Sequence, residues 1–117
     1  MDAKDTKIAI NTSIYEMLIL FFLQSKDCYG YDIYKMLKAG FNNKLNISSN
    51  RVYSIIYELR KSGIISEYTK PYGKRARHVY YHLNPIGEVV LNRLLNSYSI
   101  TINHINSIIY KPDKIEL

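Results

Sequence analysis

Residues 47–65 have the sequence ISSNRVYSIIYELRKSGII, which predicts an amphipathic helix with both ends marked. Two serines precede the apolar run and can cap its first turn, and Gly63 can adopt the left-handed conformation that ends many helices. The apolar residues that recur at helical spacing are Val52, Ile55, Ile56 and Leu59. The outward face carries Asn50, Arg51, Ser54 and Tyr57. Such a polar helix start, with free backbone N–H groups, suits the phosphates and base edges of DNA.

A basic β-hairpin is predicted directly after this helix. Residues 66–70 and 79–83 favour two strands, and the Pro-Tyr-Gly sequence at 71–73 favours a turn. The cations near the turn are Lys70, Lys74, Arg75, Arg77 and His78, and no Asp or Glu lies between Tyr68 and Gly87. A basic loop alone is more often solvated than functional. Behind an Arg-bearing helix start, however, it would face the same phosphate-lined surface as that helix.

The order of these motifs resembles the PadR family of transcriptional regulators, in its small single-domain form. The matching residues are Tyr29-Gly30-Tyr31-Asp32-Ile33, Ile47-Ser48, Val52-Tyr53, Leu59, Gly63-Ile64-Ile65, Lys74 to Arg77, Tyr80-Tyr81-His82-Leu83 and Gly87. Three positions depart from the family pattern. Ser49 and Asn50 stand where Pro and Gly are frequent, and Arg51 stands where a small Ser or Thr is usual. These departures bear on which DNA sequence is preferred, not on whether DNA is bound.

The resemblance implies an α+β fold, a winged helix-turn-helix with a long C-terminal dimerisation helix. Residues 1–117 would form a single domain, with the winged helix-turn-helix over about residues 6–84 and the dimerisation helix over about 85–110. The implied function is a homodimeric, sequence-specific regulator, a repressor, that binds a pseudo-palindromic operator in double-stranded DNA. The residues expected at base edges are Asn50, Arg51 and Ser54, and those expected at the phosphate backbone are Ser49, Tyr57, Lys74, Arg75 and Arg77.

Residues 85–110 predict a long helix that begins at Asn84 as the N-cap and Pro85 in the first turn. Its apolar residues recur at steps of four and three, the spacing of a helix that packs along another helix: Leu91, Leu95, Tyr98, Ile102, Ile105 and Ile109. One small domain has little with which to cover this stripe, so we expect a second subunit. A helix that folds back on its own domain is the alternative. By resemblance, the apolar residues 14–23 form the other half of the dimer interface.

The resemblance also implies a possible effector site. Some small PadR-type regulators bind planar apolar compounds between the terminal helices of two subunits. The corresponding residues here would be Tyr98, Tyr15 and Ile102, and the ligand would be a small aromatic compound. Packing in the core is the competing interpretation, because aromatic residues at helical spacing are more often interior than ligand-binding.

Composition excludes several other classes of protein. The net charge of +6 suits a nucleic acid or an anionic membrane. The apolar run at 14–23 contains Glu16 and is far shorter than the ~20 residues of a membrane span, so we expect no membrane partner and a cytoplasmic location.

The single cysteine, Cys28, excludes an internal disulfide, and the three histidines lack the spacing of a closed metal site. No catalytic motif or phosphate-binding glycine loop occurs, so we expect no enzyme activity, metal or cofactor.

One alternative function survives these exclusions. A winged-helix scaffold can lose DNA binding and serve as a protein-interaction module, since a fold does not determine function. The retained Arg51 and the basic hairpin speak against that loss.

Overall fold

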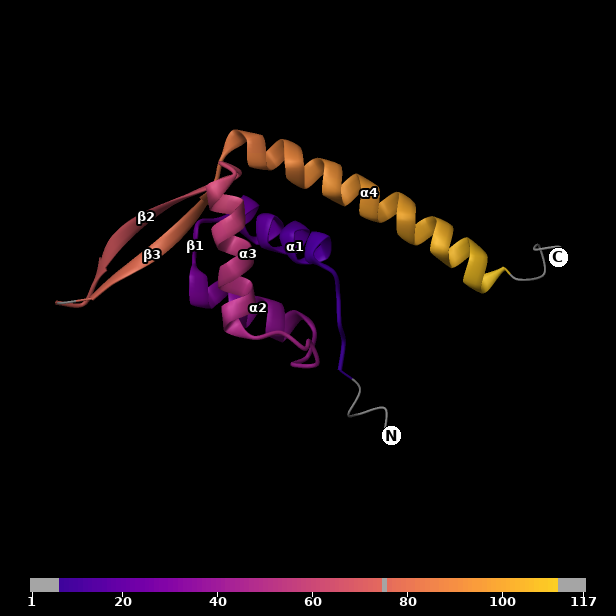
Figure 1. The fold of residues 1–117 in the computed structure, drawn as a ribbon, viewed down its shortest axis with the longest axis horizontal. Coiled ribbons are helices and arrows are strands. Elements are labelled where there is room, and N and C mark those ends of the chain that lie inside the picture. The colour runs from indigo at the N-terminus through magenta and orange to yellow at the C-terminus, as the bar shows by residue number, and fades with distance from the viewer. Residues whose placement is uncertain (1–6, 75, 112–117) are drawn as a thin grey trace.

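The computed structural model describes residues 7–74 and 76–111 (Figure 1). Its elements are α1 (Thr12–Ser25), β1 (Cys28–Tyr29), α2 (Gly30–Gly40), α3 (Ser49–Lys61), β2 (Ile65–Tyr72), β3 (Ala76–Leu83) and α4 (Pro85–Tyr110). Helices α1 to α3 form a compact group, the β2–β3 hairpin extends from one side of it, and α4 extends from the other (Figure 1). The predicted winged helix-turn-helix with a long C-terminal helix is confirmed, and the hairpin is its wing.

The helix-turn-helix is formed by α2 and α3. The turn between them contains Asn42 and Asn43, both with positive φ, a conformation that Asn tolerates better than most residues. The segment before α1 holds this turn in place, because the Ile8 N–H donates to the Lys44 carbonyl at 2.8 Å and Ile8 forms a parallel bridge with Leu45. The turn before α3 is therefore held both by its own backbone conformation and by the segment before α1.

Both ends of α3 match the sequence pattern. The Ser48 hydroxyl caps the helix by accepting the Arg51 N–H at 3.2 Å. At the other end Gly63 has a φ of +77°, which favours glycine, and the chain turns there into β2. The predicted N-cap and left-handed stop are confirmed.

The wing is part of a three-stranded antiparallel sheet with the order β1-β3-β2. In the hairpin, Ile65 pairs with Leu83 at the root and Tyr72 pairs with Ala76 at the tip, where Gly73 has a φ of +69°. Both strands are longer than the sequence predicted. The short strand β1 was not predicted, because its two residues become a strand only by pairing with β3.

The hydrophobic core lies around α1, which contacts α2, α3, α4 and β3. Most of this apolar helix is covered, because these elements pack against it from several directions. Its buried residues are Tyr15, Met17, Ile19, Leu20 and Leu23. The wing contributes Ile65 and Leu83 to the same core, and α4 contributes Leu91.

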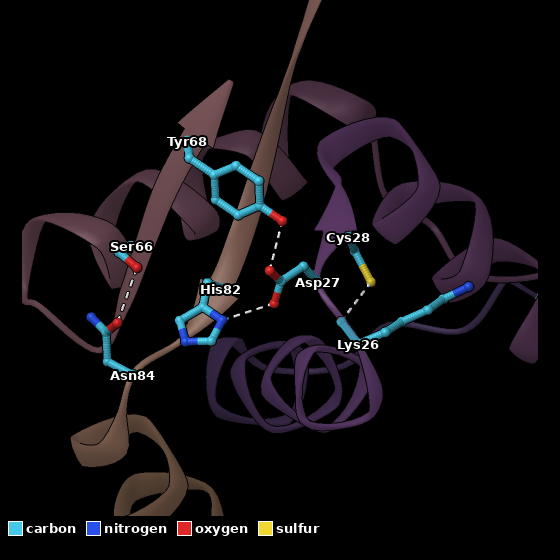
Figure 2. Close-up of polar contacts among 7 residues, drawn as sticks. All are labelled: Lys26, Asp27, Cys28, Ser66, Tyr68, His82 and Asn84. Carbon is cyan, nitrogen blue, oxygen red and sulfur yellow. Dashed lines mark hydrogen bonds and ion pairs between the residues drawn. The ribbon is translucent and has the colours of Figure 1, made fainter. Parts of the chain in front are cut away.

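Helix α4 begins where the sequence predicted, at Pro85 after the N-cap Asn84. The Asn84 side chain, however, makes no hydrogen bond to the first turn of α4. It accepts a hydrogen bond from the Ser66 hydroxyl at 3.0 Å (Figure 2) and donates one to the Gly63 carbonyl at 3.0 Å. Asn84 thus joins the end of α3, the start of β2 and the start of α4. No helix within residues 7–74 and 76–111 has the length and apolar character needed to cross a bilayer.

Candidate nucleic-acid interface

The exposed face of α3 is a continuous polar stripe. Val52, Ile55, Ile56 and Leu59 point into the core, so the opposite side of the helix faces solvent. The exposed stripe consists of Asn50, Ser54, Tyr57 and Lys61, at steps of four, three and four residues. The first three were predicted as site residues. Lys61 was missed, although the same spacing indicates it.

Tyr57 and Lys61 extend the stripe toward the C-terminal end of α3. The Tyr57 side chain is 51% exposed, and the Arg60 guanidinium lies over its ring at 5.1 Å from the centroid. The phenol hydroxyl and the Lys61 ammonium are both suitable donors to phosphate oxygens. The exposure of Tyr57 and Lys61 is compatible with the phosphate contact that was expected of Tyr57.

Arg51 lies at the edge of this stripe, because one residue of helix rotates a side chain by ~100° from its neighbour Asn50. Its Nη2 donates a hydrogen bond to the Thr12 hydroxyl at the start of α1, at 2.6 Å. The hollow around it is also lined by Glu16 and Glu58. In this conformation Arg51 contacts the start of α1, and the residue remains exposed. Ser49, the first residue of α3, is half-buried beside it.

The wing presents its cations at the exposed end of the hairpin. Lys74 lies at the turn, and Arg77 donates from Nε and Nη2 to the Thr69 hydroxyl at 3.3 and 2.9 Å. The Lys70 ammonium lies 5.1 Å from the centroid of the Tyr80 ring. Arg75, the third predicted wing cation, lies outside the described residues.

The wing and α3 meet at one hollow. Arg77 of β3 and Tyr53 of α3 line one hollow together with Tyr29, Gly30 and Tyr31. Gly30 permits this close packing, because a Cβ there would lie 3.0 Å from the Tyr53 ring. Arg77 and Tyr53 thus border the same hollow, and Tyr53 is a helical neighbour of Asn50 and Tyr57 in the exposed stripe. The stripe and this side of the wing are therefore a candidate surface for a polyanion.

A cluster around Asp27 ties the wing to the helices (Figure 2). The Tyr68 hydroxyl of β2 donates to Asp27 Oδ2 at 2.6 Å, and His82 Nδ1 of β3 lies 2.8 Å from Asp27 Oδ1. The hydrogen bond from Tyr68, and then the contact with His82, lower the pKa of Asp27, although partial desolvation opposes them. The same bond raises the pKa of Tyr68 to about 12. The sequence did not indicate this cluster, because its members are distant in the chain.

The three residues predicted for an effector pocket are not brought together within one subunit. Tyr98 lines a hollow between α1 and α4 with Ile14, Met17 and Leu94 among its walls, but neither Tyr15 nor Ile102 does. Tyr15 is only 4% exposed, and this burial raises its pKa. Tyr15 therefore lies on the core face of α1, where it packs in the interior of the subunit.

The predicted dimer stripe on α4 becomes more exposed toward the C-terminus. Leu91 is buried against the rest of the domain, Leu95 and Ile102 are half-buried, and the remaining members are exposed: Tyr98, Ile105 and Ile109. On α1, Phe21 is also exposed, and Ile14 and Leu18 are half-buried on the same side of the helix. These apolar side chains lie open to solvent in a single subunit.

Cys28 and the histidines form no reactive or metal-binding arrangement in the part of the chain that the structure describes. Cys28 is buried, and this burial raises the pKa of its thiol. No group of three His, Cys, Asp or Glu side chains is suited to hold a metal ion within residues 7–74 and 76–111.

Comparison with known proteins supports one assignment for this arrangement. The pattern of the transcriptional regulator PadR-like family matches residues 19–93, more than half of the chain. The crystal structure of smu.1704 from Streptococcus mutans UA159 is similar with a TM-score of 0.79 and 31% identity, covering 94% of this chain and 97% of that one. A transcriptional regulator from Clostridium thermocellum, Cth-833, gives a TM-score of 0.74 and 27% identity over 83% of this chain and 94% of that one.

A third solved structure shares the fold. Bacillus subtilis PadR, in complex with operator DNA, gives a TM-score of 0.64 at 23% identity, covering 70% of this chain and 46% of that one. The family consists of transcriptional regulators rather than enzymes, which confirms the prediction that this protein is not an enzyme. With its winged helix-turn-helix and its match over residues 19–93, the chain belongs to the PadR-like family of transcriptional regulators.

Proposed function

We propose that this protein is a homodimeric DNA-binding repressor that uses α3 as its recognition helix and the β2–β3 hairpin as its wing. The observation that carries the proposal is the common surface of the α3 stripe and the wing cations. Asn50, Arg51 and Ser54 would contact base edges in the major groove. The residues that would contact phosphates are Ser49, Tyr57, Lys61, Lys74 and Arg77. The operator complex of Bacillus subtilis PadR, which has the same fold, supports DNA as the partner.

The proposed homodimer rests on the uncovered apolar residues of α4 and α1. A second copy would cover both faces at once, because a twofold axis repeats the same patch on each subunit. Two recognition helices related in this way suit a pseudo-palindrome whose half-sites are ~10 base pairs apart. A DNA partner also agrees with the cytoplasmic location predicted from the sequence.

An effector site belongs to the same proposal. The hollow between α1 and α4 lies beside the proposed dimer face, and Tyr98 and Met17 supply aromatic and polarisable walls. A second subunit would bring Ile102 of its own α4 near this region. A small aromatic compound is the ligand class that such walls would accept.

Selection of bound duplexes from a random pool tests the proposed function. Enrichment of a palindromic sequence would support a dimeric, sequence-specific DNA-binding protein. The absence of binding to any duplex at low salt would instead favour the protein-interaction module.

The salt dependence of binding tests the wing separately. Lys74→Ala should weaken binding to all duplexes and reduce the slope of log K against log salt by about one unit, because one phosphate contact is lost. Arg93→Ala on α4 removes the same charge from an exposed site away from the proposed surface and is the control. Equal slopes for Lys74→Ala and the wild-type protein would remove Lys74 from the interface.

A further inference from the structure

We propose that Asp27 is a positioning residue for DNA binding, which fixes the angle of the wing relative to the helices without touching DNA itself. This inference rests on the proposed function, because it concerns how the wing reaches the phosphate backbone. Asp27 lies between the end of α1 and β1, so it connects the central helix of the core to the hairpin.

The two oxygens of the Asp27 carboxylate bind different strands of the wing (Figure 2). Oδ2 accepts from Tyr68 on β2, and Oδ1 contacts His82 on β3. Tyr68 pairs with Tyr80 across the hairpin, two residues from His82, so the two contacts lie on one face of the wing. One side chain therefore resists both bending and twisting of the hairpin. Hydrogen bonds to an ionised carboxylate are stronger than those between neutral groups.

This face of the wing is not the one that shares a hollow with α3. Arg77, Val79 and Tyr81 of β3 line that hollow with Tyr53, as does His78, whose ring stacks on Tyr29. Alternate residues of a strand point to opposite faces, and Tyr81 is the neighbour of His82. His82 therefore points the other way, toward Asp27. Of the wing cations, Lys70 lies on the Asp27 face, over the Tyr68 and Tyr80 rings, whereas Arg77 lines the hollow with α3. The carboxylate is therefore kept away from Arg77 and the face of the wing next to α3, where its negative charge would repel phosphate. Asp27 is thus placed to hold the wing and not to contact DNA.

The wing is a long hairpin that is anchored near its base, so a small change of angle there moves its tip. Ile65 and Leu83 anchor the root in the core, and Glu67 forms a 3.6 Å ion pair with Arg60 of α3 on the other face. Beyond the Asp27 contacts the hairpin is mostly exposed, including Lys74 and Arg77. From Tyr68 to the turn the strand extends by ~16 Å, so a tilt of ~10° moves the tip by ~3 Å, about the length of a hydrogen bond.

The test combines Asp27→Ala with a more conservative variant, Tyr68→Phe. The second variant removes only the hydroxyl that donates a hydrogen bond to Asp27. The matched control is Tyr80→Phe, the same change on the cross-strand neighbour, whose hydroxyl is not one of the two groups that contact Asp27. Asp27→Ala and Tyr68→Phe should each weaken binding to the selected duplex by about threefold to tenfold, because the wing must then be ordered on DNA. Amide exchange should accelerate in β2 and β3 but not in α3, and Tyr80→Phe should change neither quantity.

A double-mutant cycle separates positioning from general loss of stability. In a protein that carries Lys74→Ala and Arg77→Ala, Asp27→Ala should weaken binding by less than about twofold, because the wing contacts are already lost. The same loss of affinity in both backgrounds, or none in either, would overturn the inference. If the two wing substitutions alone leave affinity unchanged, the proposed wing contact fails, and the inference fails with it. If they weaken binding but Asp27→Ala and Tyr68→Phe do not, only the inference is overturned.

Discussion

At the scale of single residues, Gly87 shows how closely α4 is packed at its start. A Cβ at this position would lie 2.4 Å from Leu83 Cδ1 and 2.5 Å from the Ile64 carbonyl oxygen. Both distances are far below van der Waals contact, and the carbonyl belongs to the backbone and cannot rotate away. The absence of a side chain at Gly87 therefore lets α4 pack against the junction of α3 and the wing.

Gly87→Ala should lower the free energy of unfolding by ~1–3 kcal/mol or more, because overpacking forces the start of α4 away from Ile64. Gly40→Ala is the matched control, since a Cβ at Gly40 meets no atom within 4 Å of the described residues. It should be neutral or stabilising by up to ~1 kcal/mol, because alanine restricts the unfolded chain. Urea unfolding of the two variants measures the difference. Similar values for both would show that α4 can shift without cost.

The Asp27 cluster predicts a window of pH for its contribution to stability. The pKa of Asp27 is lowered from 3.8, so its contribution is present above about pH 4 and is lost as pH falls through the lowered value. The pKa of Tyr68 is raised from 10.0 to about 12, so its contribution is complete below pH 10.0 and is lost as pH rises toward 12. NMR titration of the tyrosine ring carbons should show Tyr68 ionising near pH 12. Ionisation of Tyr68 at its ordinary value would show that the hydrogen bond is absent in solution.

At the scale of elements, the sequence predicted what depends on local pattern and missed what depends on distant contacts. The limits of α3 follow from a capping serine and from Gly63, and the hairpin follows from strand-forming residues around a turn. The strand β1 and the Asp27 cluster depend on pairing across more than forty residues, which no local pattern records. For Asn84 the sequence predicted the local feature, its position as the N-cap of α4. It did not predict the hydrogen bonds of the Asn84 side chain to Ser66 and Gly63, which are distant in the chain.

Asn84→Ser tests that difference. Serine and asparagine cap helices about equally well, so the substitution would be neutral if Asn84 acted only as a cap. The shorter serine cannot span Ser66 and the Gly63 carbonyl, so we expect a loss of ~1–2 kcal/mol in the free energy of unfolding. Asn11→Ser is the control, because the Asn11 side chain does cap α1 through the Ile14 N–H. Equal stability of the two variants would contradict the bridging role of Asn84.

At the scale of the whole molecule, α1 links the proposed DNA-binding surface to the proposed dimer face. Thr12 at its start contacts Arg51 of α3, and Asp27 just beyond its end contacts both strands of the wing. Helix α1 also packs against α4, and its Phe21 side chain is exposed to solvent. A shift of α1 would therefore act on recognition helix and wing together. Nothing in the sequence pattern of α1 alone indicates this, because the linkage arises from the contacts at its two ends.

The dimer can be tested by comparing two neighbouring isoleucines of α4. Ile102 belongs to the stripe that also contains Leu95 and Ile105, whereas Ile100 is 50% exposed on nearly the opposite side of the helix. Ile102→Arg would place an unpaired charge in the proposed seam of both subunits, at a cost of several kcal/mol in assembly. Sedimentation should show a monomer, and affinity for a palindrome should fall toward that of a single half-site. Ile100→Arg adds the same charge outside the seam and should leave both dimer and binding unchanged. A stable Ile102→Arg dimer with normal binding would mean that the subunits meet through another surface.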